Sequence, residues 1–104
     1  MKDGIYLTVT HLDDFGGHIM FRVGDKLDLK KDEDNPYDDE AIAVYKDGYK
    51  CGYVANSVYT VARGTYSAGR LFDLINDDGI CKVCFITQDI IIGELMIKER
   101  KGKN

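Results

Sequence analysis

Several short segments of the chain alternate apolar with polar residues, and Gly, Asp or Asn separates most of them from their neighbours. The pattern is clearest in residues 5–10 (IYLTVT) and 26–30 (KLDLK), where Ile, Leu or Val occupies every second position. A period of two is typical of a β-strand with one buried face. We therefore expect an antiparallel sheet built from short strands.

Four further segments are predicted strands: 41–45, 49–54, 80–87 and 90–97. The first two flank Lys46-Asp47-Gly48, and Asp-Gly between two β-like segments favours a tight hairpin. Gln88-Asp89 lies where another tight turn can join the last two, which are rich in β-branched and apolar residues. The sequence thus predicts six strands in all.

Helix signals occur only after the fourth predicted strand. Ser67 can cap a helix over residues 68–75, whose apolar face would carry Leu71, Leu74 and Ile75. Residues 57–63 are predicted to form a shorter helical turn, with Val58 and Val61 as its apolar residues. The segments 11–18 and 32–40 are rich in Asp, Gly, Asn or Pro and are predicted to be loops.

These elements predict a mainly β fold: a six-stranded OB-like or SH3-like barrel with one or two short helices inserted after the fourth strand. A doubly wound sheet is not expected, because crossover helices between successive strands are absent. A chain of 104 residues has room for one domain, which we expect to span residues 1–104. Residues 98–104 are expected to form a basic, disordered tail.

Composition excludes some classes of function. A net charge of −4 argues against a protein that holds long nucleic acids by charge alone. No stretch approaches the ~18 apolar residues that cross a bilayer, and no secretory signal is recognisable. Three cysteines, an odd number, fit a reducing compartment. We expect a cytoplasmic protein that has no membrane contact.

Searches for catalytic and metal motifs favour neither an enzyme nor a metalloprotein. His11 and His18 are the only neutral-pH bases, and both lie in or beside a loop. Cys81 and Cys84 have the spacing of a zinc knuckle, but in a regular strand residues three apart point to opposite faces. The acidic segment 32–40 lacks the calcium-loop pattern. We predict a non-enzymatic protein without metal or cofactor.

Two aromatic residues in charged loops are candidates for base stacking. Tyr37 follows Pro36 and belongs to no alternating pattern, so both stacking on a ligand and packing inside the protein stay open. Phe15 has the same two interpretations, with a stronger expectation of packing because it lacks a hydroxyl group.

The segment from Asp34 to Val44, DNPYDDEAIAV, followed by Gly52-Tyr53-Val54, resembles the HIRAN domain. The similarity extends over about residues 5–97 and includes Gly24 and the loop with Phe15. The segment from Gly52 to Gly69 is similar to the stand-alone bacterial branch of the family.

The resemblance implies an OB-like barrel and capture of the 3′ end of single-stranded DNA, the activity of this domain in eukaryotic helicase-like remodelling proteins. By position, Tyr37 would stack on a terminal base, Asn35 would bond to a base edge or the backbone, and Asp38 would accept a hydrogen bond from the 3′-hydroxyl. A carboxylate repels an internal phosphate but accepts a hydrogen bond from a hydroxyl, so it would favour a free end over a continuous strand. Tyr53 and Asn56 would line the same pocket.

Some residues depart from the family pattern. The chain has Asp13 and Asp14 beside Phe15 where the DNA-binding relatives carry a basic residue and tyrosines. Phosphate contacts would then come from three other cations, Arg63, Arg70 and Lys31. An alternative function is a protein-interaction module that uses the acidic loop and Asp13-Asp14 to contact a basic partner, without DNA binding.

The expected partner is single-stranded DNA at its 3′ end, together with a helicase or nuclease encoded separately. The process would be DNA repair, replication or the activity of a mobile element. We expect the protein to act as a monomer.

Overall fold

The computed structural model describes residues 4–17, 20–57 and 59–96. The predictions for His18, Val58 and the 98–104 tail fall outside these residues. The elements, in chain order, are β1 (Tyr6–Thr10), the 3₁₀ helix η1 (Leu12–Phe15), β2 (Lys26–Lys31), β3 (Ile42–Lys46), β4 (Tyr49–Val54), α1 (Ala68–Phe72), β5 (Asp78–Ile86) and β6 (Ile91–Met96). All six strands were expected; the bounds of β4 agree with the prediction, and those of the others differ by one or two residues at an end.

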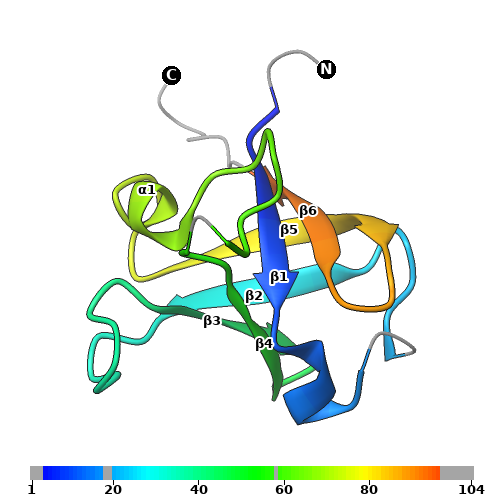
Figure 1. The fold of residues 1–104 in the computed structure, drawn as a ribbon, viewed down its shortest axis with the longest axis horizontal. Helices are drawn as coiled ribbons and strands as arrows, with labels where there is room; N and C mark the ends of the chain where they lie inside the picture. Colours follow the sequence, from blue (N-terminus) through cyan, green and yellow to red (C-terminus); the bar gives the residue numbers. More distant parts are fainter. Residues whose placement is uncertain (1–3, 18–19, 58, 97–104) are drawn as a thin grey trace, which may run out of the picture.

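The six strands form one closed antiparallel barrel in the order β1-β4-β3-β2-β5-β6 (Figure 1). The mainly β barrel is therefore confirmed. Closure removes exposed sheet edges, which would otherwise pair with other chains. The seam between β1 and β4 is short and pairs only Val9 with Val54 and Thr10 with Tyr53. Beyond this seam, β1 is contacted by the chain that follows β4, where Tyr66 N donates to Tyr6 O at 2.7 Å.

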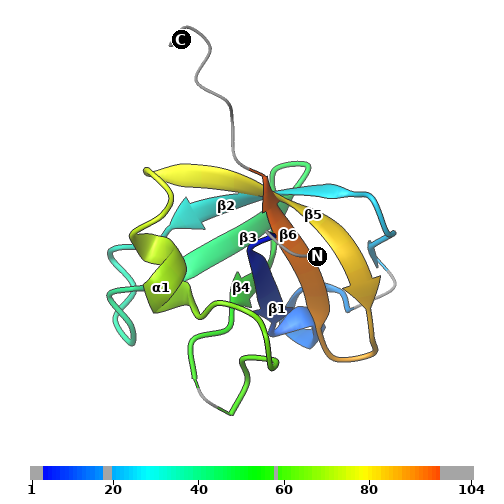
Figure 2. The same cartoon turned by 90° about the horizontal axis from the view of Figure 1, so that it is seen from above.

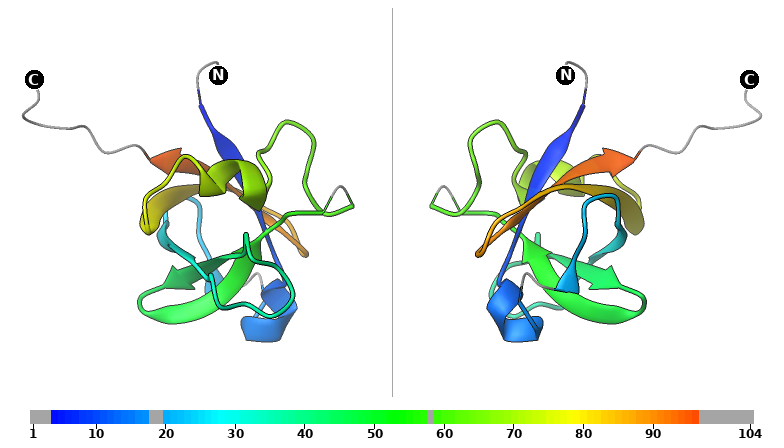
Figure 3. Two further views of the ribbon diagram at one scale, coloured as in Figure 1. Left: turned by 90° about the vertical axis from the view of Figure 1, so that its left-hand side faces the viewer. Right: turned by 90° about the vertical axis from the view of Figure 1, so that its right-hand side faces the viewer.

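The core follows the alternation seen in the sequence. Its buried members come from every strand, and the fully buried ones include Leu7, Leu27, Leu29, Val44 and Ile91. Helix α1 packs into this core through Ala68 and Leu71, while η1 buries Leu12 on another side of the barrel (Figures 1 and 3). Both short helices thus close the barrel around one apolar interior.

Helix α1 is shorter than the predicted 68–75. Ser67 caps it as expected, with its Oγ accepting from Arg70 N at 3.3 Å. Ile75 is buried against Gly79 of β5, so the chain turns towards that strand soon after Phe72. Leu74 is 51% exposed, and its predicted place on the buried face is wrong. Phe72 packs against the core instead.

Two other local predictions differ from the structure. The loop 11–18 contains η1, because Leu12 reaches the core and the turn around it closes with Gly17 N donating to Leu12 O at 2.8 Å. No helix forms in the described part of 57–63. Val61 N does donate to Ser57 O at 2.9 Å, but Ala62 N then donates to the Thr8 hydroxyl at 3.1 Å, which ends the turn.

The three thiols occupy different environments. Cys51 and Cys81 are buried, and burial raises the pKa of Cys51 to about 11 and that of Cys81 to about 12. Cys84 is partly exposed and occupies a register shift between Val83 and Phe85. Within the described residues, no three His, Cys, Asp or Glu side chains gather closely enough to hold a metal ion.

Iodoacetamide at pH 8 should modify Cys84 of the folded protein first. A thiol with a pKa of about 11 is ionised in only about one molecule in a thousand at that pH, and burial also blocks access to Cys51 and Cys81. Peptide mapping by mass spectrometry after timed quenching measures the order. Urea-unfolded protein is the control, where all three should react; equal rates in the folded state would contradict the assignment.

Thr8→Val should destabilise the protein by about 1–3 kcal/mol, because Thr8 is fully buried and its hydroxyl lies 2.8 Å from Thr65 Oγ1 and accepts from Ala62 N. The shape is conserved, so the loss comes from the unpaired groups. Urea unfolding measures it, with Thr10→Val on the same strand as a control expected to stay within about 0.5 kcal/mol. Equal stability of the two variants would show that the Thr8 hydroxyl is dispensable.

Candidate nucleic-acid interface

The loop between β2 and β3 is shaped by one amide side chain. Asn35 Oδ1 accepts from Tyr37 N at 2.8 Å and from Asp38 N at 3.1 Å, while Asn35 Nδ2 donates to Asp32 Oδ2 at 3.3 Å. Pro36 fixes its own φ between these anchors. An Asn that bonds to the backbone two and three residues ahead is a common turn-forming device. Asn35 therefore organises the loop from within.

Tyr37 stands at the outside of this loop with 94% of its surface exposed. The packing interpretation is therefore excluded. Its backbone N–H is held by Asn35, so the ring projects from a fixed position. An aromatic ring in water gains apolar contact only when a partner covers it, and stacking of one base on such a ring is worth about 1–3 kcal/mol.

Asp38 links the loop to the rest of the barrel. Its Oδ1 accepts from Glu40 N at 2.9 Å and its Oδ2 accepts from Asn56 Nδ2 at 3.0 Å. The other end of the same amide, Asn56 Oδ1, accepts from Gly69 N at 2.8 Å in α1. A carboxylate has about four acceptor sites, so two bonds leave room for a hydroxyl donor.

Gly69 leaves room for this arrangement. A Cβ at that position would lie 2.6 Å from Glu40 Oε1. The absence of a side chain lets the carboxylate of Glu40 and the amide of Asn56 both approach the first turn of α1. The loop and α1 therefore lie side by side, as two views of the ribbon also show (Figures 1 and 2).

A second cluster surrounds Tyr53 of β4. Its ring lies 6.1 Å from that of His11 and 6.3 Å from that of half-buried Phe15, measured between centroids. Lys50 Nζ donates to the Tyr53 hydroxyl at 3.0 Å and lies 5.0 Å from the ring centre. This hydrogen bond is the main cause that raises the pKa of Lys50, so the ammonium stays charged at neutral pH.

The contact between Lys50 and Tyr53 depends on a β-bulge. Val44 pairs with Gly52 and Tyr45 pairs with Lys50, which leaves Cys51 as an extra residue in β4. In a regular strand, residues three apart point to opposite faces. The extra residue brings Lys50 and Tyr53 to the same outer face. Sequence reasoning missed Lys50 for this reason.

The predicted site residues thus form two groups and one outlier. Asn35, Tyr37, Asp38 and Asn56 belong to the β2–β3 loop and its anchor, and Phe15 and Tyr53 belong to the second cluster. Asn56 follows Tyr53 by three residues, so the two groups adjoin. Arg63 is exposed on the 55–67 segment, and no hydrogen bond or ion pair within the described residues joins it to either group.

The other cations considered for phosphate contacts are Arg70, in α1, and Lys31, beside it. The Arg70 guanidinium stacks on the Tyr66 ring at 4.0 Å, and Lys31 Nζ lies 4.4 Å from the centre of the Phe72 ring. On the 55–67 segment, sequence reasoning also passed over Tyr59, which is 93% exposed. Nothing in the sequence distinguishes Tyr59 from a residue that packs against α1.

Comparison with protein families matches residues 5–83 to the HIRAN domain. Among solved structures, the crystal structure of the HIRAN domain of human HLTF is similar to this chain, with a TM-score of 0.65 and 20% sequence identity. The alignment covers 88% of this chain and 72% of that one, and at this identity it shows a shared fold. Comparison with curated protein sequences gives no match. None of the described helices is long and apolar enough to cross a membrane.

N56D should destabilise the folded protein at pH 7 by about 1–3 kcal/mol, because two carboxylates would face each other and Asp38 would lose its donor. Protonation removes the repulsion, so the deficit should shrink as the pH falls towards 4. Urea unfolding at both pH values measures the change.

N56A is the matched control, because it loses both hydrogen bonds without adding charge. Its deficit should depend much less on pH than that of N56D. Equal pH dependence of the two variants would contradict a direct contact between position 56 and Asp38.

Proposed function

The chain belongs to the HIRAN domain family, and on this premise we propose that it binds single-stranded DNA at a free 3′ end through the β2–β3 loop. HIRAN domains are DNA-binding modules, which supports nucleic-acid binding in general. The observation that carries the finer proposal is the pairing of an exposed ring, Tyr37, with an anchored carboxylate, Asp38, at adjacent positions of one stiffened loop.

In this proposal Tyr37 stacks on the terminal base. The ring is exposed before binding and its backbone is already held, so little further ordering is needed when a base covers it. Stacking is tolerant of sequence because every base has a π face. The loop would therefore recognise an end without a strong preference for its base.

Asp38 selects the end in this proposal. Its oxygens accept bonds from the protein on one side and retain acceptor capacity for a hydroxyl. A 3′-phosphate or a continuing phosphodiester would bring negative charge against the carboxylate, which is unfavourable. Asn35 would use its second amide hydrogen on the base edge or backbone, and Asn56 would hold the carboxylate in place.

The remaining residues contribute to the strand that leads away from the end. Phe15 and Tyr53 offer aromatic contacts beside the terminal pocket, and Arg63 supplies a positive charge on the neighbouring segment. HIRAN is a binding domain, and we assign the chain no catalytic role. We infer that it acts as a cytoplasmic monomer in DNA repair, replication or mobile-element processes, beside a separately encoded helicase or nuclease.

A protein-interaction function is the second candidate, and the acidity of the surface favours it. Asp13 and Asp14 are exposed on η1, and Asp34, Asp39 and Glu40 are exposed in the β2–β3 loop. Such a surface attracts a basic partner. A pull-down with and without nuclease separates the two candidates, because a partner bridged by DNA is lost on digestion.

Fluorescence anisotropy with oligonucleotides that end in 3′-hydroxyl or 3′-phosphate tests the DNA proposal. The wild type should bind the hydroxyl end at least tenfold more tightly. Tyr37→Ala should weaken both about five- to 150-fold, the equivalent of about 1–3 kcal/mol. Asp38→Asn should bring the two affinities close together by removing the repulsion.

Tyr59→Ala is the matched control, because Tyr59 is as exposed as Tyr37 but lies on another segment. It should bind like the wild type. Equal binding of both ends by the wild type would refute end recognition, and dissociation constants above about 1 mM for both would refute DNA binding, since non-specific complexes already reach about 10⁻⁴ M.

A further inference from the structure

A cavity of about 200 Å³ lies between the β3–β4 hairpin and the chain at η1 and residues 20–21, outside the β2–β3 loop. Its apolar walls are aromatic rings and sulfur-bearing side chains: Phe15, Met20, Phe21, Tyr49 and Cys51. Tyr49 is 78% exposed and Met20 is 49% exposed, so the cavity opens to solvent. The proposed function leaves this cavity unused.

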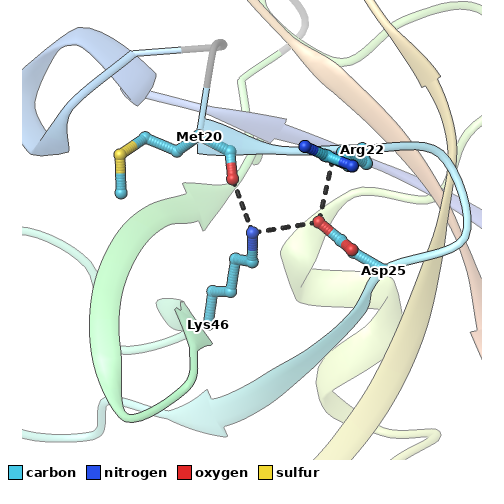
Figure 4. A network of polar contacts seen from close by, with 4 residues as sticks. All are labelled: Met20, Arg22, Asp25 and Lys46. Atoms are coloured by element: carbon cyan, nitrogen blue, oxygen red, sulfur yellow. Dashed lines mark hydrogen bonds and ion pairs between the residues drawn. The ribbon is translucent and has the colours of Figure 1, made fainter.

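Lys46 joins two sides of the cavity. Its ammonium donates to Met20 O at 2.6 Å and pairs with Asp25 Oδ2 at 3.1 Å, which ties the hairpin to the chain before β2 (Figure 4). The same Asp25 oxygen accepts from Arg22 N at 2.9 Å, and this bond, with Lys46, lowers the pKa of Asp25. The wall is therefore built before any ligand arrives.

The charges around the cavity leave one cation for a ligand. Lys46 is balanced by Asp25, and Asp47 places a carboxylate on the hairpin side. Lys50 is different, because its hydrogen bond goes to the neutral hydroxyl of Tyr53 and no ion pair is formed with it among the described residues. An anionic group near Lys50, away from Asp47, would be favoured.

The size and lining indicate the kind of ligand. An apolar cavity of about 150 Å³ is enough to hold benzene, so this one can take a single flat ring system. Aromatic faces and methionine sulfur favour such a ring. A flat ring joined to an anion is the chemistry of a nucleotide, with its base between the walls and its phosphate at Lys50.

We propose that this cavity holds an internal base of the DNA strand whose 3′ end occupies the β2–β3 loop, with Lys50 on an adjacent phosphate. The inference rests on the proposed function and extends it to a second contact. Phe15 and Lys50 line the cavity and also touch Tyr53, so the cavity continues the second cluster of the interface.

The spacing sets the length of strand required. Lys50 and Asn56 are six positions apart, which is at most about 20 Å of extended chain. A stacked strand advances about 3.4 Å per nucleotide. The cavity would then be reached at most about six nucleotides from the end, and because β4 is extended over most of this distance, a dinucleotide would be too short.

Methionine methyl signals report occupancy directly. In protein labelled at the methionine methyl carbon, an octathymidylate with a 3′-hydroxyl should shift the Met20 signal by ring current, and a dithymidylate should not. Met96, 41% exposed on β6, is the internal control and should not move. An eight-unit abasic strand should leave Met20 unchanged, because it carries phosphates without bases.

Lys50→Gln and Lys30→Gln form a matched pair for affinity. Each lysine lies over a tyrosine ring, at 5.0 Å from Tyr53 and 5.9 Å from Tyr45, but only Lys50 lines the cavity. Lys50→Gln should weaken octamer binding about tenfold and reduce its salt slope by about one, a larger effect than its effect on dimer binding. Lys30→Gln should change octamer affinity less than twofold.

The outcomes separate the two proposals. If the dimer and the octamer bind equally and both depend on Tyr37, the cavity inference is wrong and end binding stands. The same holds if the Met20 methyl signal does not shift when the octamer binds. If neither oligonucleotide binds, both proposals fail. A Met20 shift caused by the abasic strand, or by an acidic phenylalanine-containing peptide in place of DNA, would also overturn the assignment of a base.

Discussion

The side-chain amide of Asn56 is the interaction on which the geometry of the interface depends. One end of it donates to a carboxylate that can only accept, and the other end accepts from a backbone N–H that can only donate. The amide therefore has one permitted orientation. Through it, three segments distant in sequence, the β2–β3 loop, the end of β4 and the start of α1, take fixed relative positions.

A rigid loop is what the proposed stacking role of Tyr37 requires. The side chain of Asn35 and the ring of Pro36 remove conformational freedom from the loop in the free protein. Ordering that is complete before association does not subtract from the affinity of a ligand. The barrel that carries the loop is rigid as well, because its strands are hydrogen-bonded to one another in a closed ring.

The strands and the barrel were predictable because period-two alternation records which residues face the core. The β2–β3 loop was also predictable as a turn, since Asn-Pro-Tyr-Asp carries turn chemistry in its own residues. Features set by distant partners were not predictable: η1 forms because Leu12 reaches the core, and the turn after Ser57 ends because Ala62 N finds the Thr8 hydroxyl. The contact between Lys50 and Tyr53 was not predictable either, because a bulge has no clear signature in a single sequence.

The bulge at Cys51 also bears on how this hairpin would diverge. Loss of Cys51 alone would restore regular pairing with Lys50 still opposite Tyr45 and Gly52 still opposite Val44, so Lys50 and Tyr53 would both stay on the outer face. A relative with a hairpin one residue shorter could thus present the same outer side chains without a bulge. Aligning the hairpin of another family member without allowing for this offset would match Lys50 to a neighbour that points the other way.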